Sequence, residues 1–357
     1  MAAAIAIKGG AADIAYSTDF PEPAYKSFAF SCDRECNREG RTHSKLEEGQ
    51  WNPLTFWYRR SAPPMPSMEN IHPDDRPYVT KVLRAFDTGG AMLWHDTLRA
   101  RGATMVNDPH AARTAESKVL QLAHAVDAGW YVPDTLISND PERIRAFLSQ
   151  DGKFIHKSLT HFGWSEIDGC RFPRTAEISV DLLSSASLLA KTPGIYQRKI
   201  EKRAEIRAFC FGNTCLALRI EPAEGGATSP DWRGFHTPGR AFARQVTLDA
   251  ETHEACMRLM SSMGLITASF DIMVDRDGRH IFAELNQAGQ FLWLEYHHIP
   301  AVDAFSQFLL DGSSNFVWDE RHRISLADIM ESSQYKDIQM SESFNRCRPD
   351  AAVAGYA

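Results

Sequence analysis

The sequence predicts an α/β (α+β) protein, because segments with helical periodicity alternate with short apolar segments of strand type. Three observations support this prediction. Residues 108–157 read as helix, strand, helix and strand, residues 195–220 contain three strand signals, and residues 268–286 read as a β-hairpin. The α-β-α-β order of the first of these segments implies a small mixed sheet covered by helices.

Composition places the chain among ordinary globular proteins. Its 357 residues predict two or three domains, and 43% hydrophobic with 24% charged residues is usual for a soluble protein with an ample core. A net charge of −7 gives no indication of nucleic-acid binding. No apolar run approaches the length of a membrane span, and the first ten residues lack the basic region of a signal peptide.

The seven cysteines are odd in number and scattered, which argues against a disulfide framework and favours a reducing cytoplasm. Cys32 and Cys36 have no second pair or histidine cluster to complete a zinc site, so structural thiols are the better interpretation. The adjacent His297 and His298 are also a weak metal motif.

The first 107 residues give a mixed signal. Residues 3–8 are expected to form a short strand and residues 54–60 a better one, whereas residues 20–50 are charged, rich in turn residues and left unassigned. Residues 61–67 contain three prolines and are expected to be loop. Helical spacing begins at Pro73, and a second helical run ends at Gly102.

Asn107-Asp108-Pro109 begins a clearer unit, with Asp108 as N-cap and Pro109 at the first helical position. We expect one helix from there to Gly129, a natural C-cap. Strands over 130–138 and 153–157, with a helix over 140–148 between them, complete this unit.

After a polar linker at 160–174, strands are expected over 195–200, 205–211 and 214–220, the last two joined by a turn at Gly212-Asn213. Residues 225–239 read as a mobile loop, and residues 248–263 as an amphipathic helix that ends at Gly264. A helix over 302–310 follows the hairpin, and the tail from residue 313 is polar and poorly periodic.

The hairpin at 268–286 carries the strongest chemical signal. Asp277-Gly278 between two β-rich runs predicts a tight turn, since glycine takes a positive φ without steric cost. Glu284 and Asn286 are two residues apart and share one strand face, and pairing about the turn brings Asp271 within reach of it. Such oxygen ligands suit Mg²⁺ beside nucleotide phosphates, although the pattern alone equally fits an edge hairpin with solvated acids.

Several basic residues lie on predicted strands, at helix ends or in the loop at 225–239, and each by itself is more often structural or at the surface than catalytic. Together with a magnesium site, they can neutralise a triphosphate. They are Lys118, Lys157, Arg207, Arg219 and Arg233.

The order of these motifs resembles the ATP-grasp ligases, and more narrowly the microviridin-type graspetide ligases that modify ribosomally made peptides. The resemblance covers residues 54 to 312. It depends on WYRR at 57–60, NDPHAARTAESK at 107–118, GWYVPDTLISND at 129–140, DWR at 231–233 and ELNQAGQFLWLE at 284–295.

The resemblance implies a role for each matching position. The two lysines would reach the phosphates, the segment from Gln197 through Lys199 to Ile200 would contact adenine, Glu205 would lie near the ribose, and Arg207 would bind the triphosphate. Arg219 and Arg233 would assist there. The implied metal ligands are Asp271, Glu284 and Asn286.

The resemblance also implies an ATP-grasp fold of three subdomains, with ATP held between two mixed α/β units. The expected ranges are an N-terminal domain at 1–107, a central subdomain at 108–195, a C-terminal subdomain at 196–312 and a tail at 313–357. The implied cofactors are ATP and two Mg²⁺ ions, with Mn²⁺ as a substitute.

The implied reaction is phosphorylation of a carboxylate by ATP, followed by attack of an amine or hydroxyl on the acyl phosphate. The residue 225–239 loop would close over the reacting centre. The expected partner is a precursor peptide, or a small carboxylate or amine substrate, and the expected protein is a cytoplasmic homodimer that binds neither nucleic acid nor membrane.

Departures from the family pattern affect the substrate more than the nucleotide site. Ser158 and Gln287 stand where the family has proline, and residues 3–30 are shorter than a usual first strand–helix–strand unit. Two alternatives therefore stay open: a free-standing ligase of amino acids or short peptides, and a non-catalytic nucleotide- or peptide-binding module.

Overall fold

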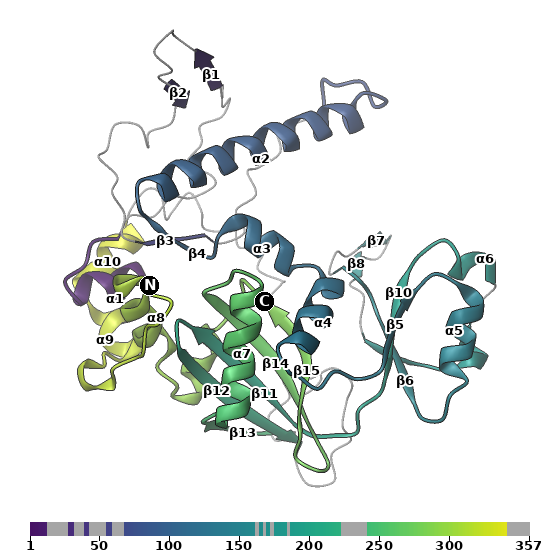
Figure 1. Ribbon diagram of the computed structural model, residues 1–357. Helices are drawn as coiled ribbons and strands as arrows, with labels where there is room; N and C mark the ends of the chain where they lie inside the picture. The colour runs from purple at the N-terminus through teal and green to yellow at the C-terminus, as the bar shows by residue number, and fades with distance from the viewer. Residues whose placement is uncertain are drawn as a thin grey trace. The chain divides into compact units, whose positions relative to one another are not determined.

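The structure is a computed structural model of the 357-residue chain (Figure 1). It describes residues 1–12, 28–31, 39–42, 55–58, 68–160, 164–166, 169–171, 175–183, 186–222 and 241–340. The chain forms two compact units, unit 1 with residues 1–109 and 302–357, and unit 2 with residues 110–301.

Unit 1 contains a long helix and short strands. β3 (Thr55–Trp57) pairs in parallel with β4 (Thr104–Val106), and β1 (Phe28–Ser31) pairs with β2 (Glu39–Thr42). α2 (Arg76–Ala100) is one continuous helix of 25 residues, so the prediction of two helical runs was wrong. The glycine pair at positions 89 and 90 lowers helix propensity without ending the helix.

The N-terminal segment is helical as well. α1 (Ala2–Ile7) replaces the short strand expected there, because a short apolar run has no period that separates the two states, and alanine has the highest helix propensity. Ala3 and Ala4 are buried against Val302 and Ile329 of the C-terminal segment. That segment is also folded, with η6 (Glu320–His322), α9 (Leu326–Glu331) and α10 (Ser333–Met340).

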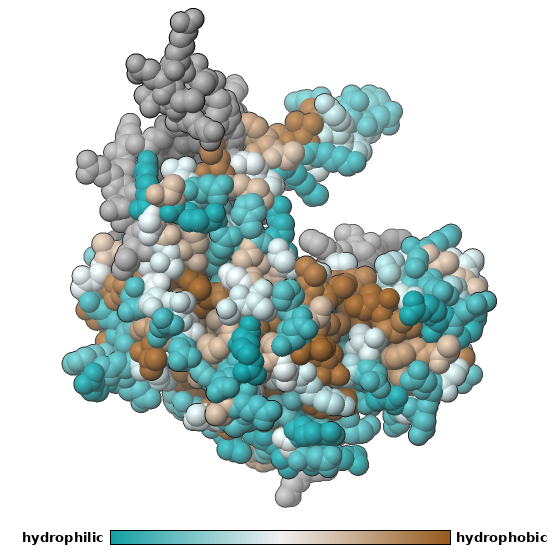
Figure 2. All heavy atoms as spheres, in the orientation of Figure 1, coloured by the Kyte–Doolittle hydropathy of each residue, from teal (hydrophilic) through white to brown (hydrophobic). Residues whose placement is uncertain are grey.

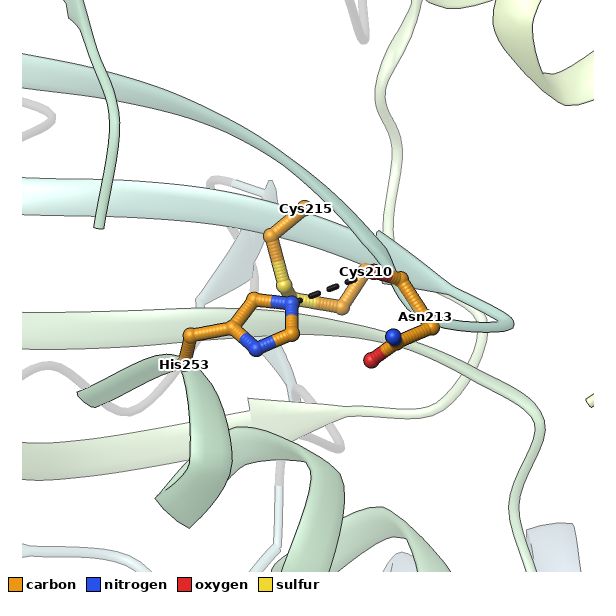
Figure 3. The surroundings of a disulfide bond; sticks show 4 residues. All are labelled: Cys210, Asn213, Cys215 and His253. Carbon is orange, nitrogen blue, oxygen red and sulfur yellow. Dashed lines mark hydrogen bonds between the residues drawn. A yellow bond between two sulfur atoms is a disulfide. The ribbon is translucent and has the colours of Figure 1, made fainter. Parts of the chain in front are cut away.

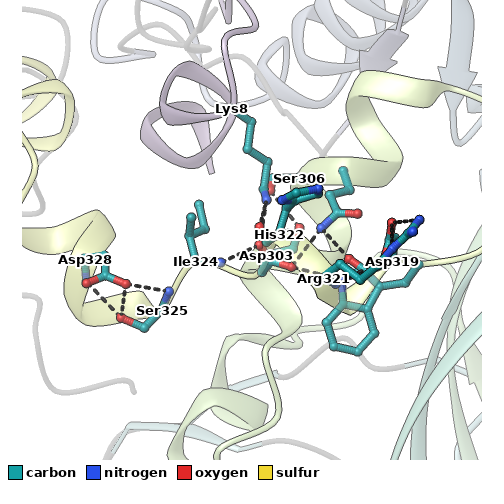
Figure 4. Close-up of polar contacts among 11 residues, drawn as sticks. Lys8, Asp303, Ser306, Asp319, Arg321, His322, Ile324, Ser325 and Asp328 are labelled. Carbon is teal, nitrogen blue, oxygen red and sulfur yellow. Dashed lines mark hydrogen bonds and ion pairs between the residues drawn. The ribbon is translucent and has the colours of Figure 1, made fainter.

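A buried carboxylate joins both ends of the chain within unit 1 (Figure 4). Asp303 lies on α8 (Ala301–Asp311), and its fully buried side chain is 2.7 Å from Lys8 Nζ. It also accepts hydrogen bonds from Gln307 Nε2 at 3.0 Å, Trp318 Nε1 at 2.9 Å and the Ile324 backbone N–H at 2.9 Å. Four donors therefore replace the water that this carboxylate loses on burial.

Unit 2 begins with a four-stranded sheet in the order β5-β10-β6-β9. Its strands are β5 (Thr135–Ser138), β6 (Phe154–Lys157), β9 (Ala176–Ile178) and β10 (Gly194–Arg198). Every pair in it is antiparallel, so the expected mixed sheet was wrong: β10 inserts between β5 and β6. Pro133 precedes β5, which limits the strand expected over 130–138 to its last four residues.

Helices cover this part of unit 2. α5 (Pro141–Leu148) confirms the helix expected over 140–148. Asp140 is its N-cap, and Ile144 and Leu148 pack against Phe154. The expected single helix at 109–129 is two helices, α3 (Pro109–Ala115) and α4 (Lys118–Asp127). They are separated at Ser117, which has extended backbone and accepts a hydrogen bond from the Leu120 N–H.

Shorter elements complete the region between β6 and β10. They are β7 (Trp164–Glu166), β8 (Gly169–Arg171), η3 (Val180–Leu182) and α6 (Ala186–Leu189). β7 and β8 pair as a hairpin inside the segment that the sequence suggested to be a linker. On the surface of unit 2, Val119, Leu120 and Val126 of α4 are exposed, and Figure 2 shows hydrophobic residues gathered over this helix.

The second sheet of unit 2 has five antiparallel strands in the order β13-β12-β11-β14-β15. They are β11 (Lys202–Phe211), β12 (Thr214–Pro222), β13 (Ala241–Val246), β14 (Thr267–Asp275) and β15 (His280–Asn286). α7 (Ala250–Ser262) and α4 supply side chains to the core on one sheet face, where Ile206, Phe270 and Leu259 are buried. The opposite face carries the polar residues described below.

One pair of cysteines departs from expectation. Cys210 and Cys215 face each other across the β11–β12 turn and form a disulfide (Figure 3). The sequence argument against a disulfide framework used the number and scatter of cysteines, and it did not detect a pair that a tight turn brings together. Cys32 and Cys36 lie outside the described residues, as do the loops expected at 61–67 and 225–239. Among the described helices, none has the length and apolarity to cross a membrane.

The buried Asp303 should dominate the stability of unit 1. Asp303→Asn keeps the shape but removes the charge that Lys8 faces, so we expect the free energy of unfolding to fall by about 3 kcal/mol. The control is Arg321→Gln, which breaks an exposed ion pair with Asp319 and should change stability by at most about 0.5 kcal/mol. If urea unfolding gave the same loss of stability for both variants, the dominant contribution of Asp303 to the stability of unit 1 would be contradicted.

Candidate functional site

The β14–β15 hairpin is built as the sequence predicted. Gly278 has a φ of +89°, and the Arg279 N–H donates to the Asp275 carboxylate at 2.8 Å, which closes the turn. Asp271 pairs directly with Glu284, and Ser269 pairs with Asn286. The three predicted metal ligands therefore occupy two neighbouring positions of one sheet face. The register confirms that these residues meet, and their role as metal ligands stays a prediction.

A β-bulge produces this register. The pairing shifts by one residue between Asp271 and Ile272, so that Ala283 has no direct partner. Phe282 and Leu285 consequently both point into the core, whereas Glu284 points to the opposite face. Without the shift, Asp271 would oppose Ala283, and Glu284 would share the buried face of Phe282.

β11 supplies charges beside this hairpin. Arg207 pairs in register with Asp271, and their side chains form an ion pair. Arg207 also donates to Glu205 Oε2 at 2.8 Å, and Glu205 forms a second ion pair with Lys202. Cations and carboxylates thus alternate across the polar face of the sheet.

α4 brings the first predicted lysine to the same place. Lys118 is the first residue of the helix; its Nζ lies 3.7 Å from Glu284 Oε1 and donates to the Ser158 carbonyl at 3.2 Å. The helix is fixed by Gln121, whose buried amide donates to the Leu285 carbonyl at 2.9 Å and accepts from the Leu285 N–H at 3.0 Å. The Gln121 amide therefore makes the same two hydrogen bonds to Leu285, the residue after Glu284, that the backbone of a neighbouring strand would make.

The second lysine comes from the four-stranded sheet. Lys157 Nζ donates to Gln197 Oε1 at 2.9 Å, and Gln197 Nε2 donates to Thr135 Oγ1 at 2.8 Å. Burial lowers the pKa of Lys157 to about 8, since desolvation outweighs the attraction of Glu284, and Lys118 lowers it further. An anion beside this ammonium would relieve the cost of holding a buried positive charge.

These side chains line one pocket within unit 2. Lys118, Lys157, Gln197 and Glu284 contribute polar groups to it, and Phe282 with neighbouring apolar residues forms the rest of its wall. Two lysines in a partly apolar pocket, with the Glu284 carboxylate at one side, suit a ligand that has an anionic group and an apolar part.

The carboxylates also fit a divalent cation. Asp271 and Glu284 lie on directly paired positions, and the Asn286 amide oxygen lies one pair further along the same face. Asn286 Oδ1 accepts a hydrogen bond from the Ala288 N–H at 3.1 Å, which holds the amide in one direction. Hard oxygen donors of this kind suit Mg²⁺ or Mn²⁺, which would neutralise phosphate oxygens when bound.

Four other predicted residues are not placed in this cluster. Arg219 pairs with Ile206, the neighbour of Arg207, so it points to the opposite sheet face, where it binds Glu221 at 2.6 Å. Lys199 forms an ion pair with Glu177, and the Ile200 side chain is partly buried after the end of β10. Arg233 lies outside the described residues.

Sequence reasoning missed Gln121, Thr135 and Lys202. The first two had no detectable signal, because an amide or hydroxyl gains its role from a distant backbone or side chain. Lys202 did have one, since it lies three residues before Glu205 at the start of a predicted strand.

Comparison with known proteins gives one curated relative and several solved structures. No family model matches the chain. A glutathione synthetase of Mesorhizobium japonicum is 26% identical over 276 residues, which cover 74% of this chain and 82% of that protein.

The similar solved structures are ATP-grasp ligases. A RiPP-associated ATP-grasp ligase of Chryseobacterium gregarium, in complex with ADP and a leader and core peptide, superposes with a TM-score of 0.70 at 20% identity, over 87% of this chain and 92% of that one. The macrocyclase MdnC of Microcystis aeruginosa, bound with the precursor peptide MdnA, gives 0.67 at 20% identity, over 87% and 95%. The ligase PsnB, complexed with a precursor variant, Mg and ADP, gives 0.63 at 19% identity, over 87% and 92%. The chain has the ATP-grasp fold, as the sequence motifs predicted.

The lowered pKa of Lys157 predicts how stability depends on pH. Below pH 8 both the folded and unfolded chains hold the proton; between pH 8 and 10.5 the folded chain releases it first, so stability rises with pH. Relative to Lys157→Met, the wild type should gain about 1 kcal/mol in free energy of unfolding between pH 7 and 9. If the difference in free energy of unfolding between the wild type and Lys157→Met did not change with pH in urea unfolding, the lowered pKa of Lys157 would be contradicted.

Gln121 should be needed for the position of α4. Gln121→Leu leaves the backbone groups of Leu285 without their partners, so we expect a loss of about 3 kcal/mol in the free energy of unfolding. Gln150→Leu is the control, because Gln150 is exposed. The measurement is urea unfolding of both variants. An equal loss of stability would contradict the role of the Gln121 amide in fixing α4.

Proposed function

We propose that this protein is an ATP-dependent ligase that joins a carboxylate to an amine or hydroxyl through an acyl phosphate. The observation that carries the proposal is the pocket in which Lys118 and Lys157 face Glu284, with Arg207 and Asp271 on the adjoining strands. A nucleotide that bound there would present its phosphates to three cations and its metal ion to two carboxylates.

The roles follow from the positions of the side chains. The two lysines and Arg207 neutralise the triphosphate and hold its terminal phosphate toward the incoming carboxylate. Asp271, Glu284 and Asn286 hold one or two Mg²⁺ ions, which withdraw charge from the phosphates. Arg207 pairs with Asp271 and Lys118 with Glu284, so a metal ion and a nucleotide that bound here would exchange these ion pairs for new ones.

The adenine would enter between the two sheets, beside Gln197. Gln197 has an exposed fraction of 2%, and its amide bridges Lys157 and Thr135, so its donor and acceptor are held in fixed directions. The backbone at Ile200 and the side chain of Lys199 would complete the base site, and Glu205 would lie near the ribose. Arg219 takes no part in this scheme, because it points to the other sheet face.

For the substrate, we propose a ribosomally made precursor peptide, in which the enzyme forms side-chain esters or amides. The similar structures that are complexed with precursor peptides support this choice, as do the motifs at residues 57–60 and 284–295. The similarity to a glutathione synthetase favours a second candidate, ligation of amino acids or short peptides. A non-catalytic module is disfavoured because a complete set of phosphate and metal groups would serve no purpose there.

Further features belong to the same proposal. We propose that residues 108–195 and 196–312 act as the central and C-terminal subdomains and that Arg233 and residues 225–239 cover the reacting centre. The enzyme would act as a cytoplasmic homodimer.

The two arginines of the second sheet provide a matched test. Arg207→Gln should weaken binding of AMPPNP and Mg²⁺ in calorimetry by about 10- to 100-fold, because a charge-assisted bond to phosphate is lost. Arg219→Gln removes the same charge from the other sheet face and should leave affinity within about twofold.

Turnover then separates the candidate functions. Glu284→Ala should abolish substrate-dependent release of ADP while the chain stays folded, and unchanged turnover would exclude the metal assignment. The enzyme is co-expressed with a short precursor peptide whose gene neighbours its own. Mass spectrometry should then show that the peptide has lost one water molecule for each bond formed. Activity on free amino acids alone would favour the ligase of amino acids or short peptides. Absence of nucleotide binding would favour the non-catalytic module.

A further inference from the structure

Three cysteine sulfurs meet on the sheet face that α7 covers. Cys210 and Cys215 come from paired positions of β11 and β12, and Cys256 comes from α7. Their sulfur atoms all lie within 4.8 Å of one another. Within the ranges that the structure describes, no other three cysteine, histidine, aspartate or glutamate side chains form such a group.

The hairpin turn explains how two of the sulfurs meet. Gly212 and Asn213 form the two-residue turn, with Gly212 at a φ of +52°, and Phe211 pairs with Thr214 to close it. The next pair, Cys210 and Cys215, therefore points to the same face, with Cα atoms 4.2 Å apart. Cysteines separated by two to four residues are typical ligands of structural zinc sites.

α7 supplies the third sulfur from the opposite side. Cys256 and Cys210 are fully buried, whereas Cys215 is partly exposed. One helical turn before Cys256, His253 Nε2 lies 3.1 Å from the Asn213 carbonyl and links the helix to the hairpin turn (Figure 3). The three sulfurs are thus held by two separate elements that other contacts already fix.

A disulfide uses only two of these sulfurs. Once the disulfide is reduced, three soft donors that all lie within 4.8 Å of one another can reach one zinc ion, whose bonds to sulfur are about 2.3 Å long. Soft thiolate ligands select zinc or copper(I) over the hard cations that suit Asp271 and Glu284.

We propose that the reduced chain binds one thiophilic metal ion, Zn²⁺, through Cys210, Cys215 and Cys256, and that the Cys210–Cys215 disulfide is its metal-free oxidised form. A dithiol reductant supplies two electrons and two protons: the S–S bond breaks, two thiols form, and the dithiol becomes a disulfide. Binding of the metal then displaces the protons of the three thiols.

The sulfur site is separate from the nucleotide pocket. Cys210 lies three residues after Arg207 on β11, and an odd spacing places the two side chains on opposite sheet faces. A metal ion there would join α7 to the β11–β12 hairpin behind the pocket. It would stabilise the sheet on which Arg207 lies without contacting the nucleotide.

The experiment uses the full chain with its other four cysteines (Cys32, Cys36, Cys170 and Cys347) replaced by serine. The chain is reduced with a phosphine under native conditions, freed of metal, and titrated with Co²⁺, whose thiolate charge-transfer absorption reports sulfur ligands. Zn²⁺ is then added as a competitor. We expect one Co²⁺ per reduced chain, displaced by Zn²⁺, and none in the same chain oxidised to the disulfide.

The oxidised chain is a control that needs no substitution of the three cysteines. In the reduced background, Cys256→Ser and Cys256→Ala should each weaken Zn²⁺ binding by at least about tenfold. Zn²⁺ should also raise the melting temperature of the reduced chain and leave that of the oxidised chain unchanged. The proposal is overturned if the disulfide resists native reduction, if the reduced chain gives no thiolate band, or if loss of the Cys256 sulfur leaves affinity unchanged.

Discussion

The contact between Gln121 and Leu285 fixes the position of Lys118 relative to Glu284. The buried amide of Gln121 bonds both backbone groups of Leu285 and a third group, the Ala115 carbonyl, at 2.7 Å. It attaches α4 to the edge strand next to Glu284 and so sets where Lys118 points. A side chain that satisfies three buried backbone groups is costly to replace, because each unpaired group would carry its own desolvation cost.

The polar face of the large sheet is organised by charge. Each cation there has a carboxylate partner, in the pairs Lys118–Glu284, Arg207–Asp271 and Lys202–Glu205. Lys157 is bonded to a neutral amide, and its burial lowers its pKa to about 8. A polyanion with a divalent cation complements this arrangement, since the anion meets the lysines and the cation meets the acids.

The two faces of β11 serve different purposes. Glu205 and Arg207 lie on the face that carries Asp271 and Glu284, whereas Ile206, Ala208 and Cys210 face α7 and the core. This alternation explains why Arg207 and Arg219 have different surroundings although both lie on paired strands and have the same chemistry. It also separates the sulfur cluster from the nucleotide pocket by the thickness of one sheet.

Local sequence signals predicted several elements of unit 2 and the residues of the candidate site. The Asp277-Gly278 turn, the helix start at Pro109 and the shared strand face of Glu284 and Asn286 depend on neighbours in the chain and were confirmed. Local patterns failed where the outcome depends on distant contacts. The apolar run at residues 3–8 is a helix, since it packs against the C-terminal segment.

Only the tertiary structure decided which side chains meet. The bulge at Ala283 turns Glu284 toward Asp271, and the register of β11 with β12 turns Arg219 away from Arg207. A shift of one residue in the pairing moves a side chain to the other sheet face. The spacing of residues within a single strand does not predict such a shift. The sequence therefore predicted the lysines, arginines and acids of the proposed nucleotide site, and the pairing of strands together with the position of α4 decided which of them lie close to one another.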